Sequence, residues 1–259
     1  MTSSDQRPVL IVAPTEDVHA RAVAAVLDRD FAVPAVIWDR ATLPRDTAID
    51  FRVGAAGSTA QLHTDAGDFP LDDFRSVWWR RALGFEIDPA VSDPRVRRYC
   101  STECDAFVKG VTRSLAVPFV NDPLAEIVAS RKPFQLVTAS RLGIPIPETL
   151  VTNNPAAVTD FWQAHHGDCI YKPLNAPDWT LPETRVLTQD DLAHLEKLRH
   201  APMIVQEKTE KGVDVRVNIF GSQVFACEFD SALPEAQLDW RLDLTAQWRA
   251  HDLPTALGD

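Results

Sequence analysis

Cys169-Ile-Tyr-Lys-Pro173 is a short, mainly apolar segment with a lysine near its end, and this pattern predicts a strand that ends on a charge. A second segment of the same kind, Met203-Ile-Val-Gln-Glu207, follows further along the chain. Between the two, Gln189 to Leu198 predicts an amphipathic helix with its leucines on one face. Strands that alternate with helices are typical of an α/β fold.

Further elements are predicted on either side of these strands. Upstream, Leu124 to Leu142 predicts one continuous helix, which Gly143 ends in the manner of a C′ glycine. Downstream, Val213 to Asn218 and Gln223 to Phe229 predict a β-hairpin that turns at Phe220-Gly-Ser. The chain therefore continues in a mixed α/β pattern toward its end.

The beginning of the chain predicts a separate α/β unit. Val9 to Ala13 and Ala35 to Trp38 are apolar runs that predict strands, and Asp17 to Arg29 predicts a helix between them. Such a β-α-β opening favours a parallel sheet covered by helices. Ser76 to Arg81 predicts a further strand, and Asp93 to Leu115 predicts a long helix behind it.

Composition argues against several classes of protein. The net charge of −11 opposes non-specific nucleic-acid binding, which needs a basic face. The sequence contains no apolar run of about 18 residues, the length that a membrane-spanning helix requires. Met1 to Pro8 is polar and has no signal-peptide pattern. We therefore expect a cytoplasmic protein without a nucleic-acid or membrane partner.

Charged and polar residues follow the predicted elements in a particular order: Lys132, Lys172, Gln206-Glu207-Lys208, Asp214 and Arg216. Bound phosphates need fixed positive charge, which lysine supplies, and a carboxylate suits the hydroxyls of a ribose. Taken singly, each residue could be a solvated surface charge, and Asp214 and Arg216 could form a plain ion pair on a strand. Their order favours nucleotide binding.

Several motifs accompany these residues along the chain: Val77-Trp-Trp-Arg-Arg81, Phe119-Val-Asn-Asp-Pro123, Arg131-Lys-Pro-Phe-Gln-Leu136, Leu142-Gly-Ile-Pro-Ile-Pro-Glu-Thr-Leu150, Tyr171-Lys-Pro173, Val205-Gln-Glu207, Asp214-Val-Arg216 and Asp239-Trp-Arg241. From about residue 124 onward the chain resembles the ATP-grasp superfamily of carboxylate–amine ligases. The whole chain resembles the microviridin-type (graspetide) maturases, which macrocyclise ribosomal peptides. This resemblance implies an α/β fold with an N-terminal pre-ATP-grasp domain followed by an incomplete ATP-grasp fold.

The resemblance also implies domain bounds and residue roles. The domains are expected at residues 1–123, 124–200 and 201–259. The nucleotide contacts are implied to come from Lys132 and Lys172 for the phosphates, Gln206, Glu207 and Lys208 for the adenine, and Asp214 for the ribose. Arg216 and Arg241 are implied to be catalytic, facing the γ-phosphate and the acyl phosphate formed from it.

The cofactors implied by the resemblance are ATP and Mg²⁺. Family members continue into a segment whose carboxylates hold magnesium, whereas no Glu-x-Asn motif follows Asp239 here. We therefore expect the magnesium ligands to be missing from this chain, and we assign no residue as a metal ligand. The pair His165-His166 is expected at the surface, at the end of a helix.

Three functional alternatives follow. The first is an ATP-dependent ligase that forms ester or amide crosslinks in a ribosomal precursor peptide, alone, as a homodimer or with a partner ligase. The second is a non-catalytic relative that binds the precursor peptide or a partner ligase, for example by strand addition at the hairpin from Asp214 to Phe229. The third is a ligase of small molecules that joins an amino acid to a carboxylic acid.

Overall fold

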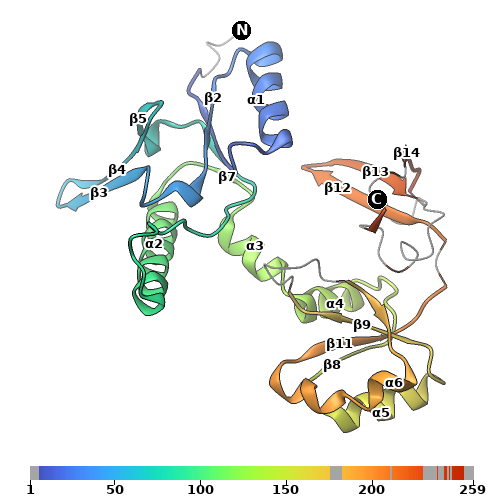
Figure 1. Ribbon diagram of the computed structural model, residues 1–259. Helices are drawn as coiled ribbons and strands as arrows, with labels where there is room; N and C mark the ends of the chain where they lie inside the picture. Colours follow the sequence, from blue (N-terminus) through green and yellow to red (C-terminus); the bar gives the residue numbers. More distant parts are fainter. Residues whose placement is uncertain are drawn as a thin grey trace. The chain divides into compact units, whose positions relative to one another are not determined.

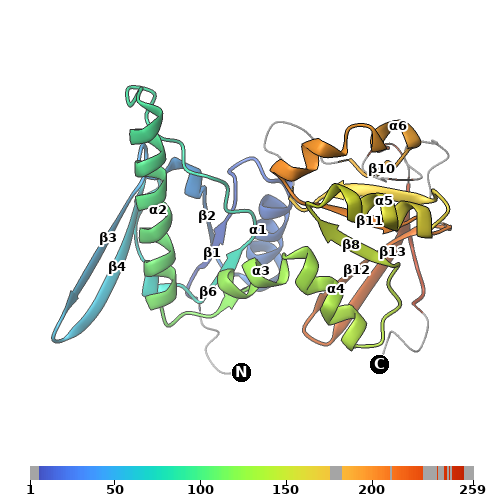
Figure 2. The same cartoon turned by 90° about the horizontal axis from the view of Figure 1, so that it is seen from below.

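The computed structural model describes residues 6–175, 183–210 and 212–229, together with residues 238, 242, 243, 245 and 247–253. The chain divides into two compact units, Met1–Ala129 and Ser130–Asp259. Figures 1 and 2 show helices and strands in both units, as an α/β fold requires. The three predicted domains stay a prediction. No helix in the described part of the chain is long and apolar enough to cross a membrane.

A parallel sheet forms the centre of the first unit. Its strand order is β2-β1-β6-β7, with the bounds Ala35–Trp38, Val9–Val12, Ser76–Trp79 and Phe119–Val120. All three neighbouring pairs run parallel. The β-α-β opening predicted from the sequence is thereby confirmed.

Two capped helices cover this sheet. The helix α1, Val18–Phe31, begins after Asp17, whose carboxylate accepts hydrogen bonds from two backbone N–H groups of the first turn. The helix α2, Pro94–Ser114, begins in the same way after Asp93. These caps satisfy donors that a helix start leaves without intrahelical partners, and so both predicted starts are set by aspartates.

Alternate residues of β1 supply the cores on the two faces of the sheet. Val9 and Ile11 join the core that includes Ala20 of α1. Leu10 and Val12 join the larger core that includes Val108 of α2. Side chains on successive strand residues point to opposite faces. The sheet is therefore buried on both sides, as parallel sheets usually are.

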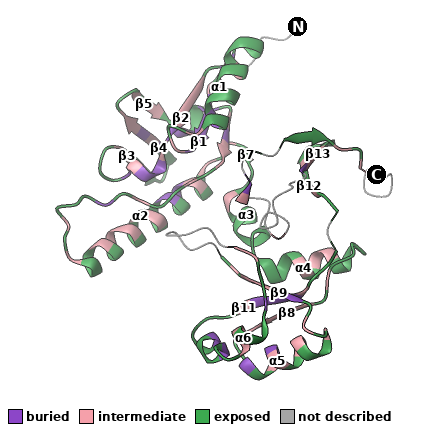
Figure 3. Cartoon of the chain, turned by 45° about the vertical axis from the view of Figure 1, so that its right-hand side comes forward, coloured by how far each residue is buried: buried purple, intermediate pink, exposed green. Residues whose placement is uncertain are grey.

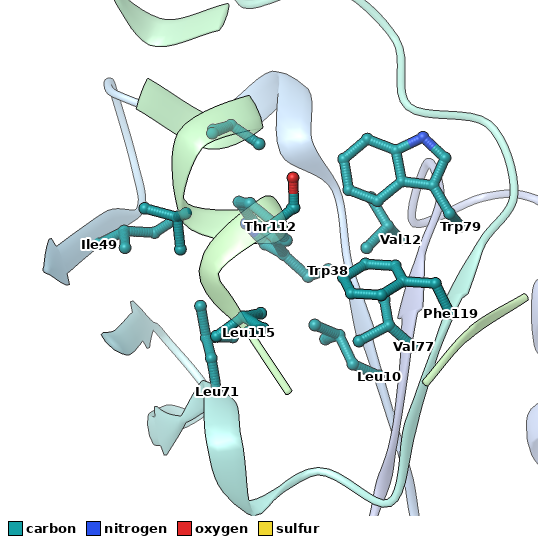
Figure 4. A pocket seen from close by; sticks show the side chains of 12 residues that line it. Leu10, Val12, Trp38, Ile49, Leu71, Val77, Trp79, Thr112, Leu115 and Phe119 are labelled. Atoms are coloured by element: carbon teal, nitrogen blue, oxygen red, sulfur yellow. The ribbon is translucent and has the colours of Figure 1, made fainter. Parts of the chain in front are cut away.

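A small apolar pocket lies in the larger core, beside α2 (Figure 4). Its lining includes Leu10 and Val77 from the sheet, Leu115 after α2, and the ring of Trp79. Trp79 also packs against Phe119, with ring centroids 6.5 Å apart. The tryptophan thus serves packing within the first unit.

A three-stranded meander completes the first unit. It consists of β3 (Ala48–Gly54), β4 (Gly57–Thr64) and β5 (Gly67–Pro70), each antiparallel to its neighbour. Leu62 of β4 is fully buried and belongs to the core under α2. The meander therefore packs on the same core as α2.

The segment predicted as one helix from Leu124 to Leu142 is two helices, so that prediction was wrong. The helix α3 spans Pro123–Ala129 and α4 spans Lys132–Arg141. Arg131 between them has extended backbone angles, φ −73° and ψ 113°. Pro133 explains the break, because a proline lacks the N–H that a helix interior needs and fits only the first turn. Gly143 has φ +73°, which agrees with its predicted role at the helix end.

An antiparallel sheet forms the first part of the second unit. Its strand order is β10-β9-β11-β8, with the bounds Arg185–Val186, Cys169–Pro173, Met203–Glu207 and Thr149–Thr152. Both β9 and β11 have the predicted bounds. The helix α5, Pro155–Ala164, packs on one face of the sheet, and Figures 1 and 2 show α4 on the other.

The helix predicted from Gln189 to Leu198 is a short α-helix followed by a 3₁₀ helix. The bounds are Gln189–Leu192 for α6 and Leu195–His200 for η3. Leucines three residues apart align in a 3₁₀ helix, which has three residues per turn. Leu195 and Leu198 are accordingly buried in the core with Val158 of α5. The apolar face was predicted correctly, but the helix type was not.

A third sheet lies toward the end of the described chain. It has the strand order β12-β13-β14, with the bounds Asp214–Phe220, Gln223–Phe229 and Trp248–Ala250. The predicted hairpin is confirmed, since β12 and β13 pair over their whole length. Gly221 occupies the turn with φ +62°, a conformation that glycine adopts at little cost.

Candidate functional site

The sheet β10-β9-β11-β8 has two chemically different faces. Lys172 of β9 is the register partner of Ile204, and Gln206 is the register partner of Thr149. Since partners across an antiparallel ladder share a face and alternate residues do too, these four side chains lie on one face. The opposite face carries Val205 and the core under α5.

A hydrogen-bonded row crosses the first of these faces. The Lys172 ammonium Nζ donates to Gln206 Oε1 at 3.0 Å, and Gln206 Nε2 donates to Thr149 Oγ1 at 2.7 Å. Gln206 is only 6% exposed, so its amide needs such partners. The row fixes a partly buried positive charge on a sheet face by means of a neutral amide. Such a charge suits an anionic ligand.

The other two residues of the predicted adenine segment have partners of their own. The Glu207 carboxylate Oε2 accepts from the backbone N–H of Glu148 at 3.3 Å. Lys208 Nζ lies 3.5 Å from Asp168 Oδ1, and its backbone N–H donates to the carbonyl of Asp168 at 2.9 Å. By strand alternation the Glu207 side chain lies on the opposite face from Lys172, whereas Lys208 is paired with Asp168. Glu207 and Lys208 could face a ligand through their backbone.

Lys132 stands at the first position of α4. Its side chain is exposed, and Nζ donates to Oε1 of Gln135 at 3.2 Å, one turn along the same helix. This contact holds the ammonium near the helix start. The nucleotide role of Lys132 stays a prediction.

Asp214 and Arg216 lie on β12, on one face of the third sheet. Their register partners are Phe229 and Cys227, and the thiol of Cys227 contacts the Arg216 carbonyl with Sγ 3.8 Å from the oxygen. The predicted common face is thereby confirmed. Asp214 is partly buried and Arg216 is exposed. Arg241 lies outside the described residues, and its catalytic role stays a prediction.

Arg80, from the tryptophan–arginine motif, serves the first unit. Its Nε donates to Asp17 Oδ1 at 2.8 Å, and its guanidinium lies 5.4 Å from the Trp78 ring. The hydrogen bond from Arg80 lowers the pKa of the Asp17 carboxyl below its usual value. This arginine therefore joins strand β6 to the cap of α1.

His165 is not at the surface, contrary to expectation. Its side chain is 16% exposed and its ring stacks on Phe161, with centroids 4.1 Å apart.

Thr149 was not predicted as part of the site. Its hydroxyl contacts Gln206 because β8 pairs with β11, and that long-range register has no local sequence signal.

Comparisons with known proteins agree with this architecture. Residues 8–128 match the family model of the MvdD pre-ATP-grasp domain. The first unit is an MvdD-type pre-ATP-grasp domain. A comparison with curated proteins finds no match.

Solved structures extend the similarity to almost the whole length of the chain. An ATP-grasp ligase from Chryseobacterium gregarium, associated with RiPPs (modified ribosomal peptides) and solved with ADP and a leader and core peptide, has a TM-score of 0.86 and 26% identity, covering 97% of this chain and 79% of its own. The macrocyclase MdnC from Microcystis aeruginosa MRC, bound to precursor peptide MdnA, has a TM-score of 0.85 and 27% identity, covering 97% and 80%. The ligase PsnB with a phosphomimetic precursor variant, Mg and ADP has a TM-score of 0.74 and 27% identity, covering 98% and 80%. The predicted resemblance to microviridin-type ATP-grasp ligases is confirmed.

Proposed function

We propose that this chain is an ATP-dependent ligase that forms ester or amide crosslinks in a ribosomal precursor peptide. The observation that carries the proposal is the similarity to the Chryseobacterium gregarium ligase over 97% of the chain. That ligase was solved with both a nucleotide and a peptide. The Lys172–Gln206–Thr149 row supports the proposal, because the row holds a positive charge on one face of the sheet β10-β9-β11-β8.

The row fits a nucleotide phosphate. The Lys172 ammonium, which donates to the amide oxygen of Gln206, is a compact positive charge of the kind that binds phosphate. In this proposal Lys172 and Lys132 contact the phosphates, residues 206–208 border the adenine, and Asp214 contacts the ribose. Mg²⁺ is proposed as the second cofactor because PsnB was solved with Mg and ADP.

The reaction joins two side chains of the same peptide. ATP supplies the γ-phosphoryl group that converts a peptide carboxylate into an acyl phosphate, with ADP as the product. A hydroxyl or amine of the peptide then attacks the acyl carbon, phosphate leaves, and the attacking group loses its proton. Arg216 and Arg241 are proposed to neutralise charge that develops on the transferred phosphoryl group. For each ring formed, the mass of the peptide therefore falls by one water, and one ATP is converted to ADP and phosphate.

The test is a ligation assay with the full chain, ATP, Mg²⁺ and candidate precursor peptides rich in Thr, Ser, Asp and Glu. Mass spectrometry should show the loss of one water per ring, with one ADP released for each. Lys172→Met should abolish both signals, while Lys197→Met, at an exposed lysine of η3, should preserve them. Activity per chain that rises with protein concentration would indicate a homodimer, and activity that needs a second protein would indicate a partner ligase.

Peptide binding without catalysis is a second candidate function. It is favoured by β12, which is an edge strand in the described part of its sheet. Ile219 and Phe220 are 67% and 64% exposed, and Figure 3 shows the hairpin as largely exposed. Such an edge can accept a peptide as an added strand. Saturable peptide binding without any ADP release would favour this function over ligation.

A further inference from the structure

Three side chains with metal-binding atoms meet at the end of β11. Glu148 precedes β8, His165 caps the C-terminus of α5, and Glu207 is the last residue of β11. Their ligand atoms all lie within 4.8 Å of one another. Strand alternation places Glu207 on the opposite face of the sheet from Gln206 and Lys172. The cluster therefore lies on the opposite face from the Lys172–Gln206–Thr149 row, and Glu207 would border the adenine only through its backbone.

The orientation of the His165 ring is fixed by its surroundings. Nδ1 lies 2.9 Å from the carbonyl oxygen of Phe161, and a carbonyl only accepts, so Nδ1 carries a proton. In the neutral imidazole, Nε2 then carries no proton, and its lone pair is available to a ligand. Nε2 lies 3.3 Å from Glu148 Oε2 and 3.9 Å from Glu207 Oε2. His165 Nε2 and the two carboxylate oxygens are thus three electron-pair donors close together, and a cation between them would stabilise this arrangement.

The arrangement around His165 is the one that metal-binding histidines use. Such a histidine normally donates its other N–H to a backbone carbonyl or carboxylate, which fixes the tautomer and aims the free nitrogen at the metal. The carbonyl of Phe161 does this here, and the stacked Phe161 ring restricts rotation of the imidazole. The donor is thus oriented before any ion binds.

The distances suit a small tetrahedral ion. Bonds of about 2.0–2.1 Å to nitrogen and oxygen separate neighbouring tetrahedral ligands by roughly 3.4 Å. The 3.3 Å between His165 Nε2 and Glu148 Oε2 already matches this value. The 3.9 Å to Glu207 Oε2 requires a shift of a few tenths of an ångström. Two carboxylates and a neutral imidazole together balance the charge of a divalent ion.

The backbone holds the two carboxylates in register. The N–H of Glu207 donates to the carbonyl of Glu148 at 3.0 Å, and the N–H of Glu148 donates to Glu207 Oε2 at 3.3 Å. His165 is anchored at the end of α5, where its N–H donates to the carbonyl of Phe161. The cluster is only partly buried, which leaves room for water as a further ligand.

We propose that Glu148, His165 and Glu207 bind a divalent transition-metal ion of the zinc class, with water completing the coordination. Imidazole with two carboxylates favours zinc and its neighbours, whereas Mg²⁺ prefers oxygen ligands alone. The ion would join the end of β11 and the start of β8 to the end of α5. This site goes beyond the proposed function, since it involves neither the nucleotide nor its magnesium.

The test is a calorimetric titration of the metal-stripped full chain with ZnCl₂, repeated with Co²⁺ and its visible absorption. The wild type should bind one equivalent. His165→Gln and Glu148→Gln should each weaken binding by about tenfold or more, since even indirect partners of a metal contribute that much. His166→Asn is the matched control, because His166 is exposed and asparagine tolerates its φ of +54°. That variant should bind like the wild type.

Three outcomes would overturn the proposal. The first is a folded wild type that binds no Zn²⁺. The second is equal binding by the wild type and both ligand variants, which would place the ion elsewhere. The third is displacement of Zn²⁺ by an equal concentration of Mg²⁺, which would indicate a site made of oxygen ligands alone. Glu148 is exposed, so Glu148→Gln keeps the test valid even where His165→Gln fails to fold.

Discussion

The two four-stranded sheets of this molecule differ in what their faces carry. The sheet β2-β1-β6-β7 is apolar on both faces, and all four residues of β1 are buried. The sheet β10-β9-β11-β8 is apolar under α5 but carries the Lys172–Gln206–Thr149 row on its other face. A sheet that is buried on both sides offers neither face to a ligand. A sheet with one polar face can be both scaffold and binding surface.

The largest effect is expected from a cavity in the first sheet. Ile11→Ala should destabilise the first unit by about 2–5 kcal/mol, because the side chain is fully buried. Hydrogen exchange followed by mass spectrometry should show lower protection in β1 and β6 but not in β9 and β11. Val18→Ala, at a residue 71% exposed, is the control and should change little. Equal loss of protection in both units would contradict the separation of roles.

The next effect concerns the polar face of the second sheet. Lys172→Met should weaken binding of a non-hydrolysable ATP analogue by about 10- to 100-fold, the range expected for one charged hydrogen bond. Calorimetric titration with and without Mg²⁺ measures it. Lys197→Met should bind like the wild type. Unchanged affinity in Lys172→Met would remove this face from the proposed site.

A smaller effect is expected at the amide that positions the lysine. Gln206→Leu removes the partners of Lys172 Nζ and Thr149 Oγ1 but keeps a side chain of similar size. Affinity for the same analogue should fall about fivefold, as for one neutral hydrogen bond. An effect larger than that of Lys172→Met would mean that Gln206, and not the lysine, is the main contact.

The smallest effect tests the acid-range stability of the first unit. The pKa of Asp17 is lowered in the folded protein, chiefly by its hydrogen bond from Arg80. Its contribution to stability is therefore present above the unfolded pKa of about 3.9 and is lost as the pH falls through the lower folded pKa. Asp17→Asn should cost about 0.5 kcal/mol at neutral pH and less at a pH below the unfolded pKa of about 3.9. Urea unfolding at both pH values measures this, and a pH-independent cost would contradict it.

The difference between the two sheets could be predicted only in part from the sequence. The bounds of β9 and β11 follow from short apolar runs, and Lys172 and Gln206 were singled out as ligand residues from motif order. Their contact depends on the register of β9 against β11, which local patterns do not determine. Strand alternation, by contrast, is a local rule, and it separates the side chains of Gln206 and Glu207, two neighbours that had been given one role.

Local chemistry also explains where the predictions were wrong. Pro133 divides the helix predicted from Leu124 to Leu142, although the apolar spacing runs through it. His165 was expected at the surface because it ends a helix, yet its side chain is only 16% exposed, between the ring of Phe161 one turn earlier and the distant Glu148. Proline effects can be read locally, whereas burial of a polar side chain depends on distant segments.

Hydrogen exchange of the full chain with and without a non-hydrolysable ATP analogue tests the central claim most directly, that the polar face of the second sheet binds the nucleotide. We predict slower exchange at residues 169–173 and 203–208 when the analogue binds, and no change at residues 9–12 and 76–79. Binding that leaves both segments of the second sheet unprotected, or that protects the first sheet instead, would contradict the account.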